Sequence, residues 1–123
     1  MKRPKILIID DEEDYCLILK SYFLKKDCEV FFTDTLKEGI QLLQQHQFDI
    51  LFLDNNLPDG NGWQIVDKIL IEMPGITIYF ISAYKQKTDL TTISSRVIVC
   101  EKPISFELLE EIYHTFNQQK EIM

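Results

Sequence analysis

Five short segments of the chain carry the continuous apolar pattern of strands that are buried on both faces of a sheet. They cover residues 5–9, 29–32, 48–53, 76–81 and 97–100. The stretches between most of them repeat apolar residues at the spacing of one helix face. This alternation of strands and helices predicts right-handed crossover units and a parallel sheet covered by helices on both faces.

Apolar spacing and end signals place the helices. The first helix should bury one face, formed by Tyr15, Ile18, Leu19, Tyr22 and Phe23. A capping-box pattern from Thr35 to Glu38 predicts the start of the second helix. The third begins at Trp63, which we expect in the core, and ends before the Pro-Gly pair at 74–75. Ser105 is a suitable N-cap for the last helix, whose apolar positions are Leu109, Ile112, Tyr113 and Phe116.

Two segments carry different signals. Residues 55–62, with the sequence NNLPDGNG, are dense in turn formers and predict a loop. Residues 84–96 hold several Thr and Ser but few strong helix formers, and they predict a short or irregular helix. We therefore expect an α/β fold with a doubly wound five-stranded parallel sheet of order 2-1-3-4-5, in three layers. Residues 1–123 should form a single domain.

The composition narrows the range of functions. Thirteen Lys and Arg residues are outnumbered by 20 Asp and Glu residues, and the formal net charge is −7. Since phosphate contacts need a basic face, we expect no direct binding of nucleic acid and no binding to anionic membranes. No apolar run approaches the ~18 residues of a membrane-spanning helix. Because Cys16, Cys28 and Cys100 have neither disulfide nor metal-site spacing, we expect reduced core thiols and a cytoplasmic location.

The residues that follow the predicted strands carry the chemistry. Asp10 and Asp11 follow the first strand, Asp54 the third, Ser82 the fourth and Lys102 the fifth. In a doubly wound sheet the functional crevice lies outside the carboxyl ends of the strands, so these side chains should converge at one edge. The sequence thus predicts a crevice with three carboxylates, one hydroxyl and one ammonium.

Clustered carboxylates repel one another unless a cation lies between them. Oxygen ligands with no nearby His or Cys favour Mg²⁺, or Mn²⁺ in its place. The chain has no glycine-rich phosphate-binding loop, and its acidic turn after the first strand would repel the phosphate of a flavin nucleotide. The chemistry that remains is a phosphoryl group received covalently on a carboxylate and neutralised by the metal and the lysine.

Other polar residues have simpler structural interpretations. Glu12, Glu13 and Asp14 are interpreted as a solvated helix start that complements the helix dipole, not as ligands. His46 and His114 lie late in predicted helices without a partner at metal spacing, so we expect both at the surface.

With these residues in view, the sequence resembles the receiver domains of two-component response regulators over roughly residues 4 to 118. The segment DNNLPDGNG follows the family pattern D-x-x-x-P-x-x-x-G. The resemblance rests on residues that follow the predicted strands, namely Asp10-Asp11, Asp54 with Pro58 and Gly62, Ser82-Ala83, and Lys102-Pro103.

The resemblance implies a phosphoryl-transfer role for several of these residues. Asp54 would be the phosphoacceptor that attacks the phosphorus of a phosphohistidine on a partner. Lys102 would pair with Asp54 and then with a phosphoryl oxygen, and Ser82 would bond another phosphoryl oxygen. Ala83 would leave the site open, and Pro103 would follow Lys102 through a cis peptide bond.

The resemblance also implies the metal ligands and the partners. Asp11 and Asp54 would ligate Mg²⁺ directly, Asp10 would act through water, and the backbone carbonyl of Asn56 would complete the protein ligands. The partner would be a sensor histidine kinase or a phosphotransfer protein, and a second copy of the chain could form a homodimer with it. The module would change conformation to regulate a downstream partner, and its only catalysis would be its own phosphorylation and dephosphorylation.

Two departures from the family pattern affect the output mechanism. The family usually has an aromatic switch residue three positions before the lysine, and here Val99 stands there. The segment before the fifth strand lacks the frequent Gly-Ala turn. Because a short branched side chain has few rotamers, we expect the response to lie in the backbone order of residues 84–96.

Two other functions stay open on sequence grounds. One is an interaction module with the same fold that does not use phosphate. The other is a Mg²⁺-dependent phosphohydrolase of another α/β family, whose usual second Asp would stand two residues after the nucleophile, where this chain has Asn56.

Overall fold

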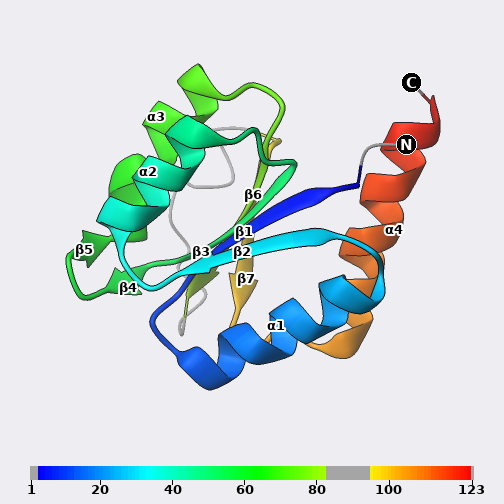
Figure 1. Cartoon of the computed structure of the whole chain (residues 1–123), viewed down its shortest axis with the longest axis horizontal. Helices are drawn as coiled ribbons and strands as arrows, with labels where there is room; N and C mark the ends of the chain where they lie inside the picture. Colours follow the sequence, from blue (N-terminus) through cyan, green and yellow to red (C-terminus); the bar gives the residue numbers. More distant parts are fainter. Residues whose placement is uncertain (1–2, 83–94, 123) are drawn as a thin grey trace.

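A parallel five-stranded sheet forms the middle layer of the protein, as the computed structural model in Figure 1 shows for residues 3–82 and 95–122. The order β2-β1-β3-β6-β7 is the predicted order 2-1-3-4-5. The strands are β1 (Lys5–Ile9), β2 (Glu29–Thr33), β3 (Ile50–Asp54), β6 (Thr77–Ser82) and β7 (Val97–Glu101). The predicted fold class is therefore confirmed.

Helices cover both faces of this sheet. On one face lie α2 (Leu36–Gln45) and α3 (Val66–Glu72), and on the other lie α1 (Glu13–Lys25) and α4 (Phe106–Ile122) (Figure 1). Each face has its own apolar core, because alternate strand residues point to opposite sides. β3 is buried along its whole length, and its last residue is therefore a buried aspartate, Asp54.

The helix starts follow the sequence signals in part. The Thr35 hydroxyl accepts a hydrogen bond from the Glu38 backbone N–H at 3.2 Å, so the predicted N-cap is confirmed. The reciprocal half of the box is missing, because the Glu38 carboxylate accepts from the Thr33 hydroxyl at 2.7 Å. The Ser105 hydroxyl accepts from the Leu108 N–H at 3.1 Å, as predicted.

Residues 55–62 are more ordered than the predicted loop. They form an antiparallel pair of two-residue strands, β4 (Asn56–Leu57) and β5 (Gly60–Asn61), which leads into the 3₁₀ turn η1 (Gly62–Ile65). The Asn61 N–H donates to the Gln64 side chain at 3.3 Å, and the two residues form a capping box. The predicted helix at 84–96 lies outside the described residues except for a turn at 95–96.

Five expectations about burial have different outcomes. Ile18 is 63% exposed and Trp63 is 37% exposed, so their predicted places in the core are wrong. The Trp63 ring packs against the Phe80 ring in a T-shaped arrangement, with 5.8 Å between the centroids. His114 is exposed as expected, whereas His46 is half-buried with its ring 4.7 Å from that of Phe31. The cysteines are confirmed as buried thiols without disulfide bonds.

Candidate functional site

The carboxyl ends of the strands bring the predicted site residues to one edge of the sheet. Asp54 ends β3, Ser82 ends β6, Asp10 follows β1, and Lys102 follows β7. Asp10, Asp54 and Ser82 are buried, at 0%, 4% and 6% exposure, while Asp11 beside them is exposed. Buried carboxylates are costly unless they are paired, so this edge must hold compensating charge.

Three carboxylates meet within a few ångströms of one another at this edge. One oxygen each of Asp10, Asp11 and Asp54 lies within 4.8 Å of the others. Burial, and then the neighbouring Asp10 charge, raises the pKa of Asp54 to about 6. Burial also raises the pKa of Asp10. The cluster is therefore short of positive charge.

Lys102 supplies a cation to this cluster. Its ammonium lies 3.1 Å from Asp10 Oδ2, 3.5 Å from Asp54 Oδ2 and 2.8 Å from Glu12 Oε1. The Tyr15 ring centroid lies 5.1 Å from the same nitrogen. Burial alone lowers the pKa of Lys102, but the hydrogen bond to Glu12 and the Asp10 charge outweigh it and raise that pKa.

One buried oxygen of the cluster accepts no hydrogen bond. Asp10 Oδ2 has no hydrogen-bond partner among the described residues, although the Lys102 ammonium lies near it. A buried carboxylate oxygen that can still accept a bond and two neighbouring carboxylates fit a hard divalent cation such as Mg²⁺. Within residues 3–82 and 95–122, the group that could hold the ion contains no nitrogen or sulfur ligand. The residues present therefore suit the metal that the sequence predicts.

The loop after Asp54 is fixed by hydrogen bonds at both ends. The Asn55 N–H donates to the Ile81 carbonyl at 3.1 Å, and the Gly62 N–H donates to the Asn55 carbonyl at 2.9 Å. The Asp59 carboxylate accepts from the backbone N–H groups of Leu36 and Lys37 at 2.8 and 3.0 Å, and so caps the start of α2.

This loop places Asn56 beside the Asp54 carboxylate. Its backbone N–H donates to the Asp54 carboxylate, which partly offsets the rise in the pKa of Asp54. The metal-binding role of its carbonyl oxygen stays a prediction.

Sequence reasoning missed the contribution of α1 to the site. Glu12 is solvated at the start of α1, as predicted, but its carboxylate also makes the shortest contact to Lys102. The Tyr15 hydroxyl accepts a hydrogen bond from the Ile104 N–H at 3.3 Å, which ties α1 to the segment after Lys102. The cis peptide bond between Lys102 and Pro103 is present, as the resemblance implies.

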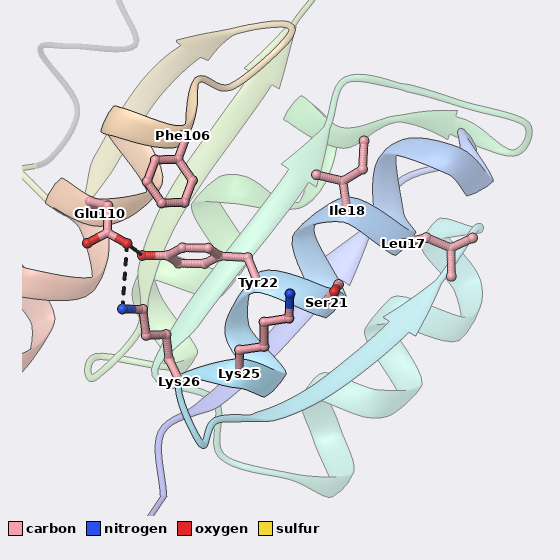
Figure 2. Close-up of a pocket in the computed structure, with 8 residues that line it drawn as sticks. All are labelled: Leu17, Ile18, Ser21, Tyr22, Lys25, Lys26, Phe106 and Glu110. Carbon is pink, nitrogen blue, oxygen red and sulfur yellow. Dashed lines mark hydrogen bonds and ion pairs between the residues drawn. The ribbon is translucent and has the colours of Figure 1, made fainter.

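An apolar groove opens between α1 and α4 (Figure 2). Both helices start shortly after residues of the site, because α1 follows Asp10 and Asp11 and α4 follows Lys102. The groove has a volume of about 580 Å³, and Leu17, Ile18 and Phe106 are exposed in it at 56%, 63% and 66%. At one end of the groove, Figure 2 shows the Tyr22 hydroxyl, which donates a hydrogen bond to Glu110, and the Lys26 ammonium, which lies 3.6 Å from the same carboxylate. The exposed apolar side chains therefore lie beside the polar cluster of Tyr22, Lys26 and Glu110.

Comparison with known proteins gives the family. A family model for the response regulator receiver domain matches residues 6–113. The response regulator SaeR of Staphylococcus aureus is 34% identical over 84 residues, which is 68% of this chain and 36% of SaeR. The chain therefore spans about a third of the length of this relative. It belongs to the response regulator receiver domain family, a family of signalling modules in two-component systems.

Solved structures share the fold over nearly the whole chain. A response regulator receiver domain protein from Methanospirillum hungatei has a TM-score of 0.83 at 24% identity, with 99% of this chain and 100% of that chain covered. A two-component response regulator from Clostridium difficile has a TM-score of 0.85 at 23% identity, with 96% and 98% covered. The response regulator TrrA from Thermotoga maritima, solved in complex with Mg²⁺ and BeF, has a TM-score of 0.79 at 21% identity, with 92% and 98% covered.

Among the described residues, no helix has the length and apolar character needed to cross a membrane.

Proposed function

We propose that this chain accepts a phosphoryl group on Asp54 and thereby acts as the phosphoacceptor of a two-component system. The observation that supports this role is the position of Asp54. It is a buried carboxylate at the end of the central strand β3, between two other aspartates and the ammonium of Lys102. Residues 1–123 would form one receiver domain with a cytoplasmic location.

The transfer step needs an in-line attack by one oxygen of Asp54. The Asp54 oxygen forms a bond to phosphorus while the bond from phosphorus to the imidazole nitrogen of a phosphohistidine breaks, and the electron pair stays on that nitrogen. When the module resets, water attacks the phosphorus, the bond from phosphorus to the Asp54 oxygen breaks, and the products are the free carboxylate and inorganic phosphate. The raised pKa of Asp54, about 6, leaves the carboxylate largely ionised at neutral pH.

Two side chains would bind the transferred group. Lys102, already 3.5 Å from Asp54, would neutralise one phosphoryl oxygen. Ser82 would donate its hydroxyl hydrogen to another, because it ends β6 next to β3, where Ile81 lies opposite Asp54. Ala83 follows it in the sequence with a side chain too small to obstruct the group.

Asp10, Asp11, Asp54 and the Asn56 carbonyl would hold a Mg²⁺ ion, or Mn²⁺ in its place. When bound, the ion supplies charge neutralisation and orients the phosphoryl oxygens. Asp10 lies deepest of the aspartates and would act through water, while the exposed Asp11 would ligate directly.

The phosphodonor would be a sensor histidine kinase or a phosphotransfer protein. The groove between α1 and α4 supports this partner, because an apolar surface next to the acceptor edge can seat a protein helix. A homodimer through another face is compatible with the fold, and the phosphorylated state would regulate a downstream partner. We expect no direct contact with nucleic acid, since the chain carries a net charge of −7.

Intact-mass analysis after incubation with acetyl phosphate and Mg²⁺ tests the proposal. The wild-type chain should gain about 80 Da, the mass of one phosphoryl group. Asp54→Asn should gain nothing, while the matched control Asp67→Asn, at an exposed position of α3, should behave as wild type. A persistent adduct on Asp54→Asn would show that another residue is the acceptor.

A further inference from the structure

The nearest carboxylate to the Lys102 ammonium is not the proposed acceptor. Glu12 Oε1 lies 2.8 Å from Lys102 Nζ, whereas Asp54 Oδ2 lies 3.5 Å away. The hydrogen bond to Glu12 is the stronger of the two contacts by distance. In this state Lys102 therefore makes its best hydrogen bond with a residue on the outer side of the cluster.

The backbone explains why the Glu12 side chain is available for this contact. Glu12 is the N-cap of α1, with an extended conformation (φ −90°, ψ 98°), yet its side chain makes no capping hydrogen bond. Its own backbone N–H donates to Asp10 Oδ1 at 2.9 Å. Asp10 thereby fixes the Glu12 backbone, and the Glu12 carboxylate turns to Lys102.

Tyr15 limits where the ammonium can go. Its ring lies 5.1 Å from Lys102 Nζ, and its hydroxyl is fixed by the Ile104 N–H. The Lys102 side chain is only 13% exposed, whereas the Glu12 side chain is 63% exposed. Lys102 can thus shift over a short path between the Glu12 carboxylate and the Asp54 oxygens, and Glu12 can turn away into water.

We propose that Glu12 is a positioning residue. It hydrogen-bonds to Lys102 in the unphosphorylated state and releases it when Asp54 is phosphorylated. This inference rests on the proposed function. Glu12 competes with the phosphoryl oxygens for the Lys102 ammonium. It therefore weakens the binding of a phosphoryl group, or of an analogue such as beryllofluoride, at the site. An exposed partner contributes little, so the effect should be about 2- to 5-fold.

Titration with beryllofluoride in the presence of Mg²⁺, followed by Trp63 fluorescence, measures this competition. Glu12→Gln should bind beryllofluoride about 2- to 5-fold more tightly than wild type. Glu12→Asp keeps the charge but is one methylene too short to reach Lys102, so it should resemble Glu12→Gln. Glu13→Gln removes the same charge from the next, exposed residue and should match wild type.

A measurement without any phosphoryl analogue examines the contact itself. In ¹⁵N NMR spectra of the side-chain ammonium groups, the Lys102 protons should exchange with water faster in Glu12→Gln and Glu12→Asp than in wild type and Glu13→Gln. A merely structural role of Glu12 in starting α1 would leave this exchange unchanged.

The outcomes separate the two proposals. If wild type binds beryllofluoride and Glu12→Gln binds it equally or more weakly, Glu12 does not compete for Lys102 and this inference is wrong. If Glu12→Asp behaves as wild type, net charge and not the contact is responsible, which also overturns it. If wild type does not bind beryllofluoride at all, the proposed function fails, and the inference fails with it.

Discussion

Gly62 lies directly against the backbone carbonyl oxygen of Asp54. A Cβ atom built on Gly62 would overlap that oxygen and would also come within 2.9 Å of the Leu53 side chain. The contact joins the end of the loop at residues 55–62 to Asp54, and the Gly62 N–H also donates to the Asn55 carbonyl at 2.9 Å. A glycine is therefore needed here for space.

Gly62→Ala should displace either the loop at residues 55–62 or Asp54. We expect a loss of about 1–3 kcal/mol in the free energy of unfolding and slower phosphorylation by acetyl phosphate. Urea denaturation and intact-mass kinetics measure the two effects. Gly75→Ala is the matched control, because nothing lies within 4 Å of its Cβ position. Equal stabilities of the two variants would show that the site tolerates the methyl group.

Asp54→Asn should stabilise the metal-free protein at neutral pH. Burial and Asp10 raise the folded pKa of Asp54 from 3.8 to about 6. The carboxyl group therefore contributes stability that is present below pH 3.8 and is lost as pH rises through about 6. Removing the charge should raise the free energy of unfolding by about 1–3 kcal/mol at pH 7.5, and the gain should vanish near pH 4. Urea denaturation of both proteins at pH 7.5 and near pH 4 measures this difference. A gain in stability that is independent of pH would contradict the electrostatic cause.

Phosphorylation by acetyl phosphate should require a divalent cation. The carboxylates at Asp10, Asp11 and Asp54 lie within 4.8 Å and repel an incoming phosphoryl group unless a cation neutralises them. Trp63 fluorescence should report binding of the cation, because the Trp63 backbone N–H lies 3.4 Å from the side-chain oxygen of Asn55, the residue after Asp54. Excess EDTA should abolish the mass gain, and undiminished uptake in EDTA would refute the metal requirement.

Ile18→Glu should separate partner recognition from chemistry. Ile18 is 63% exposed in the groove between α1 and α4, so the change should leave stability within about 0.5 kcal/mol. Transfer from a histidine kinase partner should slow about 10-fold or more, while acetyl phosphate should react as with wild type. Ile71→Glu, at an 81% exposed position of α3, is the control. If both variants accept phosphate from the kinase normally, the groove does not seat the phosphodonor.

The sequence predicts that phosphorylation changes the backbone order of residues 84–96. Val99 is half-buried in β7 and packs beside the core on the α2 and α3 face, and its short side chain cannot act as a rotating ring. Beryllofluoride should therefore change the hydrogen exchange of residues 84–96. Changes confined to residues 54–62 would show that the switch lies elsewhere.

The strand order and the edge of the site could be predicted because both depend on local signals. A strand buried on both faces is apolar throughout, and right-handed crossovers then leave few possible orders. The strand ends carry Asp10, Asp54 and Lys102 in the sequence itself, so their convergence follows from the fold class alone.

Features that depend on distant neighbours could not be predicted in the same way. Glu12 and Lys102 are 90 positions apart, and nothing in the run DDEED shows which carboxylate turns to the lysine. Ile18 has the helical spacing of a core residue, but α4 places Phe106 beside Tyr22 and leaves Ile18 uncovered. Periodicity identifies a helix face without showing how much of that face the next element covers.

The place of β1 in the sheet affects how the chain folds as it is made. β1 lies between β2 and β3, with Leu7 opposite Phe31 on one side and opposite Leu51 on the other. Until β3 has left the ribosome, one edge of this apolar strand has no partner and is open to pairing with other extended chains. The N-terminal part of a growing chain is therefore at its greatest risk of aggregation before Leu51 reaches Leu7.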